Sequence, residues 1–496
     1  MASSSQETHT NPQDDASARA KASQDPLANS PYEEYDKNKM SAVDRQYAAL
    51  DSNLPKRIYV IGTGSIGKLV AHSLRGAANP PPVTLMLHRY SLMEAWKKGK
   101  KRITIRTGKN DDWKAGFQAE LLPQTRRQHK VTLREGQPNT WDLGDNVRPH
   151  EAAQILQEQI ELENEDTETQ KEVPMFENES QEQSTPQNED ISDEPIYNLI
   201  ICTKAARTLA ALTAIRHRLS SSSTICFLQN GMGTIDEINA ELFPDPETRP
   251  TYIQGIITHG VNVPREMAER DPFFAVHAGQ GTIALGILPR EETKPSSTAD
   301  EEASLAQAST QLIHKTDRWA PSARYIIRTL TRIPVLCAVG FTPAELLQHQ
   351  LEKLAINSIL NPLTALLDTR NGGILYNFAL TRTMRLLLAE TSLVIRSLPE
   401  LHGIPNVNTR FSPERLETLV VSVANQTKEN ISSMLADIRA GRQTEIKYIN
   451  GYIVKRGEEL GVQCVVNYAI MQTVIGKALI TQREADDDVP QEINYS

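Results

Sequence analysis

The sequence predicts an α/β protein in which a parallel sheet is followed by an all-helical part. Three observations predict this architecture. A β-branched run at Arg57–Ile61 leads directly into a glycine turn at Gly62–Gly67, and a helical pattern follows the turn. Two later apolar runs, 197–202 and 224–228, end in polar residues, as strands of such a sheet do. After about residue 318, long Leu, Ile and Ala patterns at helical spacing dominate.

The strand, glycine turn and helix form the arrangement of a Rossmann-type dinucleotide-binding unit. Gly62 permits the tight turn, Gly64 lets a pyrophosphate approach the backbone, and Gly67 lets the helix close onto the strand. The free N–H groups at the start of the helix then face the phosphates. We therefore expect the whole turn to contact the cofactor, including its intervening residues Thr63, Ser65 and Ile66.

The next strand indicates which dinucleotide is bound. Val83–Leu87 ends at His88 and Arg89, where an NAD site usually places Asp or Glu for the ribose hydroxyls. A guanidinium instead suits a 2′-phosphate, because its planar fork donates two charge-assisted hydrogen bonds. A solvated surface arginine is the alternative interpretation. We predict NADP(H) as the cofactor, with Arg89 at its 2′-phosphate.

Composition excludes several classes of protein. The chain has 496 residues and a net charge of −9, which gives no overall attraction to nucleic acid or to an anionic membrane. It contains no apolar run near the roughly 20 residues that span a bilayer. The four cysteines lack metal-ligand spacing, so we expect buried free thiols and no bound metal. A cytoplasmic protein is the resulting expectation.

Shifts in composition predict the domain organisation. Residues 1–55 are expected to form a disordered polar extension, and 136–193 a disordered acidic insertion, because neither can bury enough apolar surface to order itself. The dinucleotide-binding domain is expected over 56–317, with antiparallel strands at 251–288 completing its sheet. A helical substrate domain is expected over 318–484, followed by an acidic tail at 485–496. An active site in the cleft between the two domains follows.

A row of polar side chains lies in the first long helical pattern. Lys353, Asn357 and Asn361 recur every four residues and so share one face of a helix. Pro362 should kink or interrupt that helix. The row either points into the interdomain cleft or is an ordinary polar face with an asparagine capping a helix start.

Four further polar residues are candidates for the same cleft. Lys204 and Asn230 follow the apolar runs at 197–202 and 224–228, so they reach the same sheet edge as the glycine turn. Ser433 and Glu445 lie in a second helical cluster. Taken alone, each of these two has a structural explanation, as a helix cap or as an acid at a helix start.

Together these motifs resemble the ketopantoate reductase (2-dehydropantoate 2-reductase) family over most of 57–480. Besides the glycine turn, the matching motifs are Cys-Thr-Lys at 202–204, Gln-Asn-Gly at 229–231, Thr-His-Gly at 258–260, His-Ala-Gly-Gln-Gly at 277–281, Lys353-x-x-x-Asn357-x-x-x-Asn361-Pro362, Ser-Ser-Met-Leu at 432–435 and Thr-Glu-Ile at 444–446. The chain departs from the family pattern after Lys204, where Ala-Ala-Arg replaces the usual continuation with Gln.

The resemblance implies a helical domain of the 6-phosphogluconate-dehydrogenase C-terminal type. It also implies NADPH-dependent reduction of 2-dehydropantoate to (R)-pantoate, a step toward pantothenate and coenzyme A. Lys353 would be the general acid, and Glu445 would assist it. The substrate would be held by Asn357, Asn361, Ser433 and Asn230, and the cofactor by the glycine turn, Arg89, Lys204 and Asn230.

Two alternatives remain open at this stage. One is a non-catalytic NADP(H)-binding regulatory or interaction protein of the same family, which the long polar additions favour. The other is a reductase for a different 2-keto acid, because contacts with the substrate side chain cannot be read from sequence. A homodimer is also left open.

Overall fold

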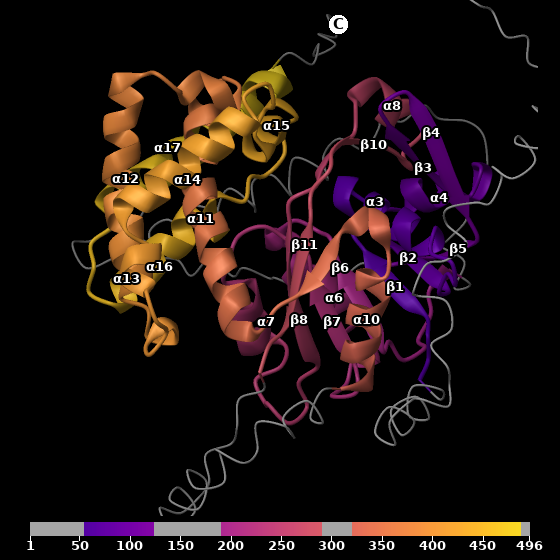
Figure 1. The fold of residues 1–496 in the computed structure, drawn as a ribbon. Helices are drawn as coiled ribbons and strands as arrows, with labels where there is room; N and C mark the ends of the chain where they lie inside the picture. Colours follow the sequence, from indigo (N-terminus) through magenta and orange to yellow (C-terminus); the bar gives the residue numbers. More distant parts are fainter. Residues whose placement is uncertain (1–53, 124–189, 290–319, 488–496) are drawn as a thin grey trace, which may run out of the picture. The chain divides into compact units, whose positions relative to one another are not determined.

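The computed structural model describes residues 54–123, 190–289 and 320–487 (Figure 1). Most of the predicted N-terminal extension, most of the predicted acidic insertion and most of the predicted C-terminal tail lie outside these ranges. The fold class is confirmed: a parallel-sheet part is followed by a helical part.

An eight-stranded sheet holds the first part together. Its order is β12-β11-β8-β7-β6-β1-β2-β5. The strands are β1 (Ile58–Ile61), β2 (Val83–Leu87), β5 (Phe117–Leu121), β6 (Asn198–Ile201), β7 (Thr224–Phe227), β8 (Thr251–Ile257), β11 (Ile283–Ile287) and β12 (Ala338–Gly340). All neighbours pair in parallel except β8 and β11. The carboxyl ends of β2, β1, β6 and β7 therefore meet at one edge.

Both faces of this sheet are buried. Along β1, Ile58 and Val60 enter one apolar core, whereas Tyr59 and Ile61 enter another on the opposite face. The first core is covered by α3 (Ser65–Arg75) and α10 (Pro321–Thr331), and the second by α6 (Thr208–Ala214) and α7 (Thr234–Glu241). Burial on two faces explains the continuous apolar runs seen in the sequence.

A second, four-stranded sheet changes one expectation. Its order is β4-β3-β10-β9, from β3 (Arg102–Thr107), β4 (Asn110–Ala115), β9 (Gly260–Asn262) and β10 (Phe274–Gly279). The segment 251–288 is thus divided between the two sheets, and its first strand, β8, pairs in parallel with β7. The expectation is confirmed in part: β8 and β11 are antiparallel neighbours in the main sheet, whereas β9 and β10, also antiparallel, belong to the second sheet. Helix α4 (Tyr90–Lys98) packs against β2 and β5 of the main sheet, and the short helix α8 (Arg265–Arg270) lies between β9 and β10 in the chain.

The segment 321–340 belongs with the sheet. Helix α10 contributes Ile326 and Leu330 to the first sheet core, and β12 pairs with β11 at the sheet edge. The helical part therefore begins near residue 343 rather than at 318. Thr342 caps the first helix there, with its side chain and that of Glu345 forming a capping box.

Six helices build the helical part around α11 (Pro343–Leu366), which packs against α12, α14, α15 and α17. These six are α12 (Phe378–Arg396), the short α13 (Val407–Arg410), α14 (Pro413–Gln426), α15 (Ser433–Arg439), α16 (Asn450–Glu459) and α17 (Val465–Asp487). Helix α17 continues into the predicted tail. None of the helices in the described ranges combines the length and apolar character that crossing a bilayer needs.

Helix α11 continues through Pro362, so of the two outcomes that we expected there, a kink or an interruption, the interruption does not occur. A proline cannot donate a hydrogen bond to the carbonyl four residues earlier, here that of Ser358. The side-chain Nδ2 of Asn450 donates to this oxygen at 3.0 Å instead. Asn450 is fully buried and also donates to Oδ1 of Asn467, on α17. An amide from α16 thus replaces the missing bond and keeps Asn361 helical.

The cysteines differ in exposure. All four are free, and Cys226 and Cys464 are buried as expected, but Cys337 is exposed and Cys202 is only partly buried. The expectation of four buried thiols is therefore wrong for these two residues.

Candidate active site

Lys353 reaches from the helical part to the sheet part. It lies on α11, and its ammonium donates to Oδ1 of Asn230 at 2.8 Å and to the carbonyl oxygen of Ile257 at 2.7 Å. An ammonium carries three hydrogens. One N–H remains for another acceptor, since no third partner of Lys353 lies among the residues that the structure describes.

Asn230 connects Lys353 to Glu445. While its Oδ1 accepts from Lys353, its Nδ2 donates to Oε2 of Glu445 at 3.2 Å. Glu445 is only 6% exposed and also accepts from the backbone N–H of Ala205 at 3.4 Å. With both ends of the amide engaged, the orientation of Asn230 is fixed.

The environment lowers the pKa of Lys353 to about 8. Burial is the larger effect, because it disfavours the charged ammonium, and the nearby Glu445 carboxylate opposes it. The sequence predicted the direction of the Glu445 effect, but not that burial outweighs it. The result is an ammonium poised near neutral pH, which suits a proton donor.

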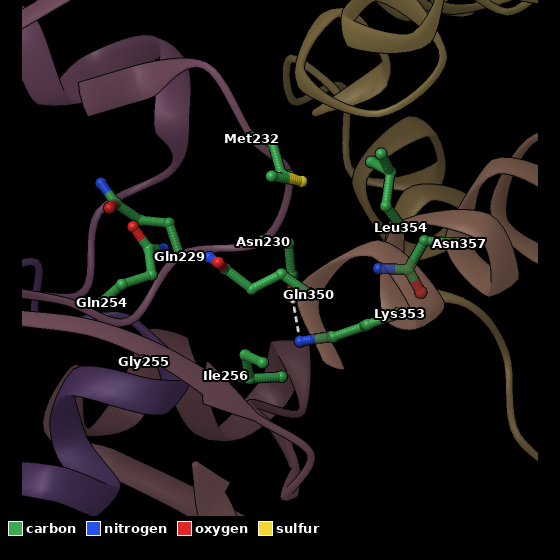
Figure 2. A pocket seen from close by; sticks show the side chains of 11 residues that line it. Gln229, Asn230, Met232, Gln254, Gly255, Ile256, Gln350, Lys353, Leu354 and Asn357 are labelled. Atoms are coloured by element: carbon green, nitrogen blue, oxygen red, sulfur yellow. Dashed lines mark hydrogen bonds between the residues drawn. The ribbon is translucent and has the colours of Figure 1, made fainter. Parts of the chain in front are cut away.

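A small open pocket lies beside this lysine (Figure 2). Figure 2 shows Lys353 reaching from α11 to Asn230, with Leu354 and Asn357 beside it on the same helix. The remaining lining residues are Gln229, Gly231, Met232, Gln254, Gly255, Ile256 and Gln350. The sequence singled out Gln229 only as part of the Gln-Asn-Gly motif, and it did not single out Gln254 or Gln350, because an isolated glutamine forms no recognisable spacing pattern.

Two predicted substrate residues do not line this pocket. Asn361 is buried on α11, two turns from Lys353. Ser433 is exposed at the start of α15, and the helix cap is its neighbour Ser432, whose Oγ accepts from the backbone N–H of Leu435 at 3.1 Å. Their proposed contacts with substrate therefore find no support in the pocket.

The glycine turn has the shape that a dinucleotide needs. Gly62 has φ +91°, and a Cβ there would lie 2.5 Å from the backbone nitrogen of Thr203. A Cβ on Gly67 would overlap the carbonyl oxygen of Gly62, so helix and turn are in close contact. A Cβ on Gly64 would meet no atom within 4 Å, which leaves open space over the turn. Helix α3 begins there without an acidic residue in its first turn.

Basic side chains gather at the end of β2. Desolvation of the imidazole and the charges of Arg89 and Arg207 lower the pKa of His88 to about 4. Arg207 follows β6 and is the last residue of the Ala-Ala-Arg stretch that departs from the family pattern. The sequence marked this position only as a departure, and the structure brings its charge to the same place as Arg89. The glycine turn fits a dinucleotide, and the cluster adds positive charge at the end of the neighbouring strand.

Lys204 joins the two parts through ion pairs. Its ammonium lies 2.6 Å from Oδ2 of Asp437 and 3.5 Å from Oε2 of Glu445. Burial lowers its pKa, but the two carboxylates outweigh burial, so the net shift is upward. Lys204 therefore remains charged at neutral pH.

Two family models match the chain. The model for Ketopantoate reductase PanE/ApbA matches residues 142–290, and the model for its C terminal matches residues 345–478. The first match begins inside the segment predicted as an insertion and does not include the glycine turn.

Similar proteins fall into two groups by name. A probable 2-dehydropantoate 2-reductase of Schizosaccharomyces pombe is 31% identical over 278 residues, covering 56% of this chain and 72% of the relative. A ketoisovalerate reductase of Gibberella fujikuroi is 26% identical over 441 residues, covering 82% of this chain and 79% of the relative.

Solved structures share the fold. A PanE/ApbA family ketopantoate reductase from Ralstonia eutropha JMP134 has a TM-score of 0.51 at 15% identity, and the match covers 86% of this chain and 99% of that one. A D-mandelate dehydrogenase with NADH and anilino(oxo)acetate has a TM-score of 0.50 at 16% identity, with the same coverage. Given the two family models in sequence order and a relative 31% identical over 72% of its own length, the protein belongs to the ketopantoate reductase family of oxidoreductases.

Proposed function

We propose that the protein reduces small 2-keto acids with NADPH, and that 2-dehydropantoate, reduced to (R)-pantoate on the route to pantothenate, is the first candidate substrate. The observation that carries this proposal is the Lys353 ammonium at the pocket wall. It is held by Asn230 and by the carbonyl oxygen of Ile257, and its pKa is about 8. A proton donor in that state can deliver a proton at neutral pH and stabilise charge on a substrate oxygen.

The chain's own residues perform the proton chemistry in this proposal. Bound NADPH supplies the hydride that adds to C2 of the keto acid. The free N–H of Lys353 donates to the substrate carbonyl oxygen and transfers its proton there as the C–O bond becomes single. Lys353 then regains a proton from solvent through the open pocket. Glu445 and Asn230 keep the ammonium aimed, and Asn357, beside Lys353, is available for the substrate carboxylate.

NADP(H) rather than NAD(H) is the proposed cofactor. Arg89 and Arg207 supply two guanidinium groups at the end of β2, where an acidic residue would favour a free ribose hydroxyl. Each can donate a bidentate pair of hydrogen bonds to a phosphate. The open space over Gly64 would take the pyrophosphate, with the start of α3 facing it.

Ketoisovalerate is the second candidate substrate. The ketoisovalerate reductase relative aligns with 82% of this chain, more than the 56% for the 2-dehydropantoate 2-reductase relative. The two keto acids differ by one hydroxymethyl group at the branched carbon, which only 2-dehydropantoate carries. A pocket that hydrogen-bonds this hydroxyl rejects the analogue lacking it by a large factor, whereas an apolar pocket discriminates weakly. The amide side chains of Gln254 and Gln350 favour the hydroxylated substrate.

The experiment measures NADPH oxidation with a panel of 2-keto acids, in parallel with NADH. We expect turnover of 2-dehydropantoate with NADPH, and Lys353→Ala should lower kcat by about 10² to 10⁴ while leaving NADPH binding nearly intact. The exposed Lys428→Ala is the matched control and should be unchanged. Binding of NADPH without reduction of any keto acid would favour the non-catalytic alternative, and comparable kcat in Lys353→Ala would remove Lys353 from the mechanism.

A further inference from the structure

Asp437 is a buried carboxylate outside the pocket. It lies on α15 and is only 3% exposed. Its Oδ2 accepts from the Lys204 ammonium at 2.6 Å, and its Oδ1 accepts from Nε and Nη2 of Arg442 at 3.2 and 3.1 Å. A carboxylate so deeply buried is costly unless paired, and its nearer partner here comes from the sheet part.

The Lys204 ammonium has two carboxylates within reach. It is close to Asp437 and, at 3.5 Å, only loosely placed against Oε2 of Glu445. The same Oε2 accepts the hydrogen bond from Asn230. Lys204 and Asn230 therefore donate to the same oxygen atom, and Asp437 holds the Lys204 ammonium nearer to itself than to that oxygen.

We propose that Asp437 is a positioning residue: by holding Lys204, it leaves Glu445 free to orient Asn230 and, through Asn230, Lys353. The proposal rests on the proposed role of Lys353 as proton donor. Asp437 itself touches neither the pocket nor Lys353.

Loss of the Asp437 charge should act on Lys353 in two ways. Lys204 should move closer to Glu445 and weaken the hydrogen bond by which Glu445 fixes the Asn230 amide. The Glu445 charge is also what raises the pKa of Lys353 against burial, so neutralising it should lower that pKa further. The charges facing Lys204 in the structure are those of Glu445, Asp437 and Arg442, and the charge facing Lys353 is that of Glu445.

The test is Asp437→Asn, read out first without any substrate. Competitive labelling of amines over a pH series, followed by mass spectrometry, gives the pKa of Lys353 in the full-length protein. We expect that pKa to fall by about 0.5 to 1 unit, with the alkaline limb of kcat/KM moving by the same amount. Asp437→Glu, which keeps the charge, should restore most of the wild-type value.

The matched control is Asp368→Asn. Asp368 also pairs with an arginine of α15, Arg439, at 2.9 Å, but in solvent. This variant should leave the pKa of Lys353 unchanged. An Asp437→Asn protein whose Lys353 titrates as in the wild type, or whose defect Asp437→Glu does not repair, would overturn the proposal.

A second comparison decides the matter if Asp437→Asn fails to fold. Lys204→Met and the double variant Lys204→Met/Asp437→Asn should give the same Lys353 pKa, because the ammonium through which Asp437 acts is missing from both. A difference between them would overturn the proposal. Since labelling needs no turnover, a protein that reduces no 2-keto acid would refute the proposed function while still testing Asp437.

Discussion

Raising the pH should inactivate the protein well before an ordinary lysine titrates. Burial lowers the pKa of Lys353 to about 8, against an unperturbed value near 10.4. The protonated fraction of a group with pKa 8 is about nine-tenths at pH 7 and about one-tenth at pH 9. The rate of a step that needs the ammonium should therefore fall about tenfold between these two pH values, whereas an unperturbed lysine would lose only a few per cent.

Single-turnover oxidation of NADPH by 2-dehydropantoate is the assay for this prediction, because it isolates the chemical step from product release. Glu445→Gln removes the charge that supports the ammonium, so its alkaline limb should lie at lower pH than in the wild type. Lys353→Arg does not titrate in this range, so any residual rate should be flat. A wild-type rate that stays constant to pH 10 would refute the reasoning, as would a limb that Glu445→Gln leaves in place.

Three further predictions concern the cofactor site and α11. Arg89→Ala and Arg207→Gln should each raise the Kd for NADPH about 10- to 100-fold and leave that for NADH nearly unchanged, which a fluorescence titration of both cofactors would measure. Gly64→Val should abolish nucleotide binding with an unchanged Tm, because its side chain enters open space; a large loss of Tm would contradict that placement. Asn450→Leu should lower the free energy of unfolding, measured with denaturant, by about 1 to 3 kcal/mol. The loss should be smaller in a Pro362→Ala background, because the backbone N–H of residue 362 can then donate to the Ser358 carbonyl. An equal loss in both backgrounds would show that the Asn450 side chain does not replace this backbone hydrogen bond.

The first β-α-β unit could be predicted because its signals are local. The β-branched residues, the glycine turn and the basic end of β2 lie within about 35 consecutive residues, and each has a direct structural meaning. The polar row of α11 was also visible, since Lys353 and Asn357 recur at helical spacing.

Long-range pairings could not be predicted in the same way. β10 joins β3 across about 170 residues, and nothing in either segment names its partner. Likewise, Pro362 alone indicates a broken helix, and only Asn450, far along the chain, explains why the helix continues. Asp437 appears in the sequence only as an acidic residue in a helical pattern. Its proposed positioning role depends on its ion pair with Lys204, which only the fold brings about.

Helix α11 leaves the sheet almost without a linker. Strand β12 ends at Gly340, the N–H of Phe341 still donates to Leu285 O at 2.7 Å, and Thr342 already caps the helix. From that pivot, eleven residues of helix make a lever arm of about 16 Å to Lys353. A swing of about 10° at Phe341 would carry the ammonium about 3 Å, the length of a hydrogen bond, so a slight rocking is enough to engage or release it. One residue inserted between Thr342 and Lys353 would rotate Lys353 by about 100° around the helix axis and turn its side chain away from Asn230. The number of residues in this segment is therefore as important for the site as the lysine itself.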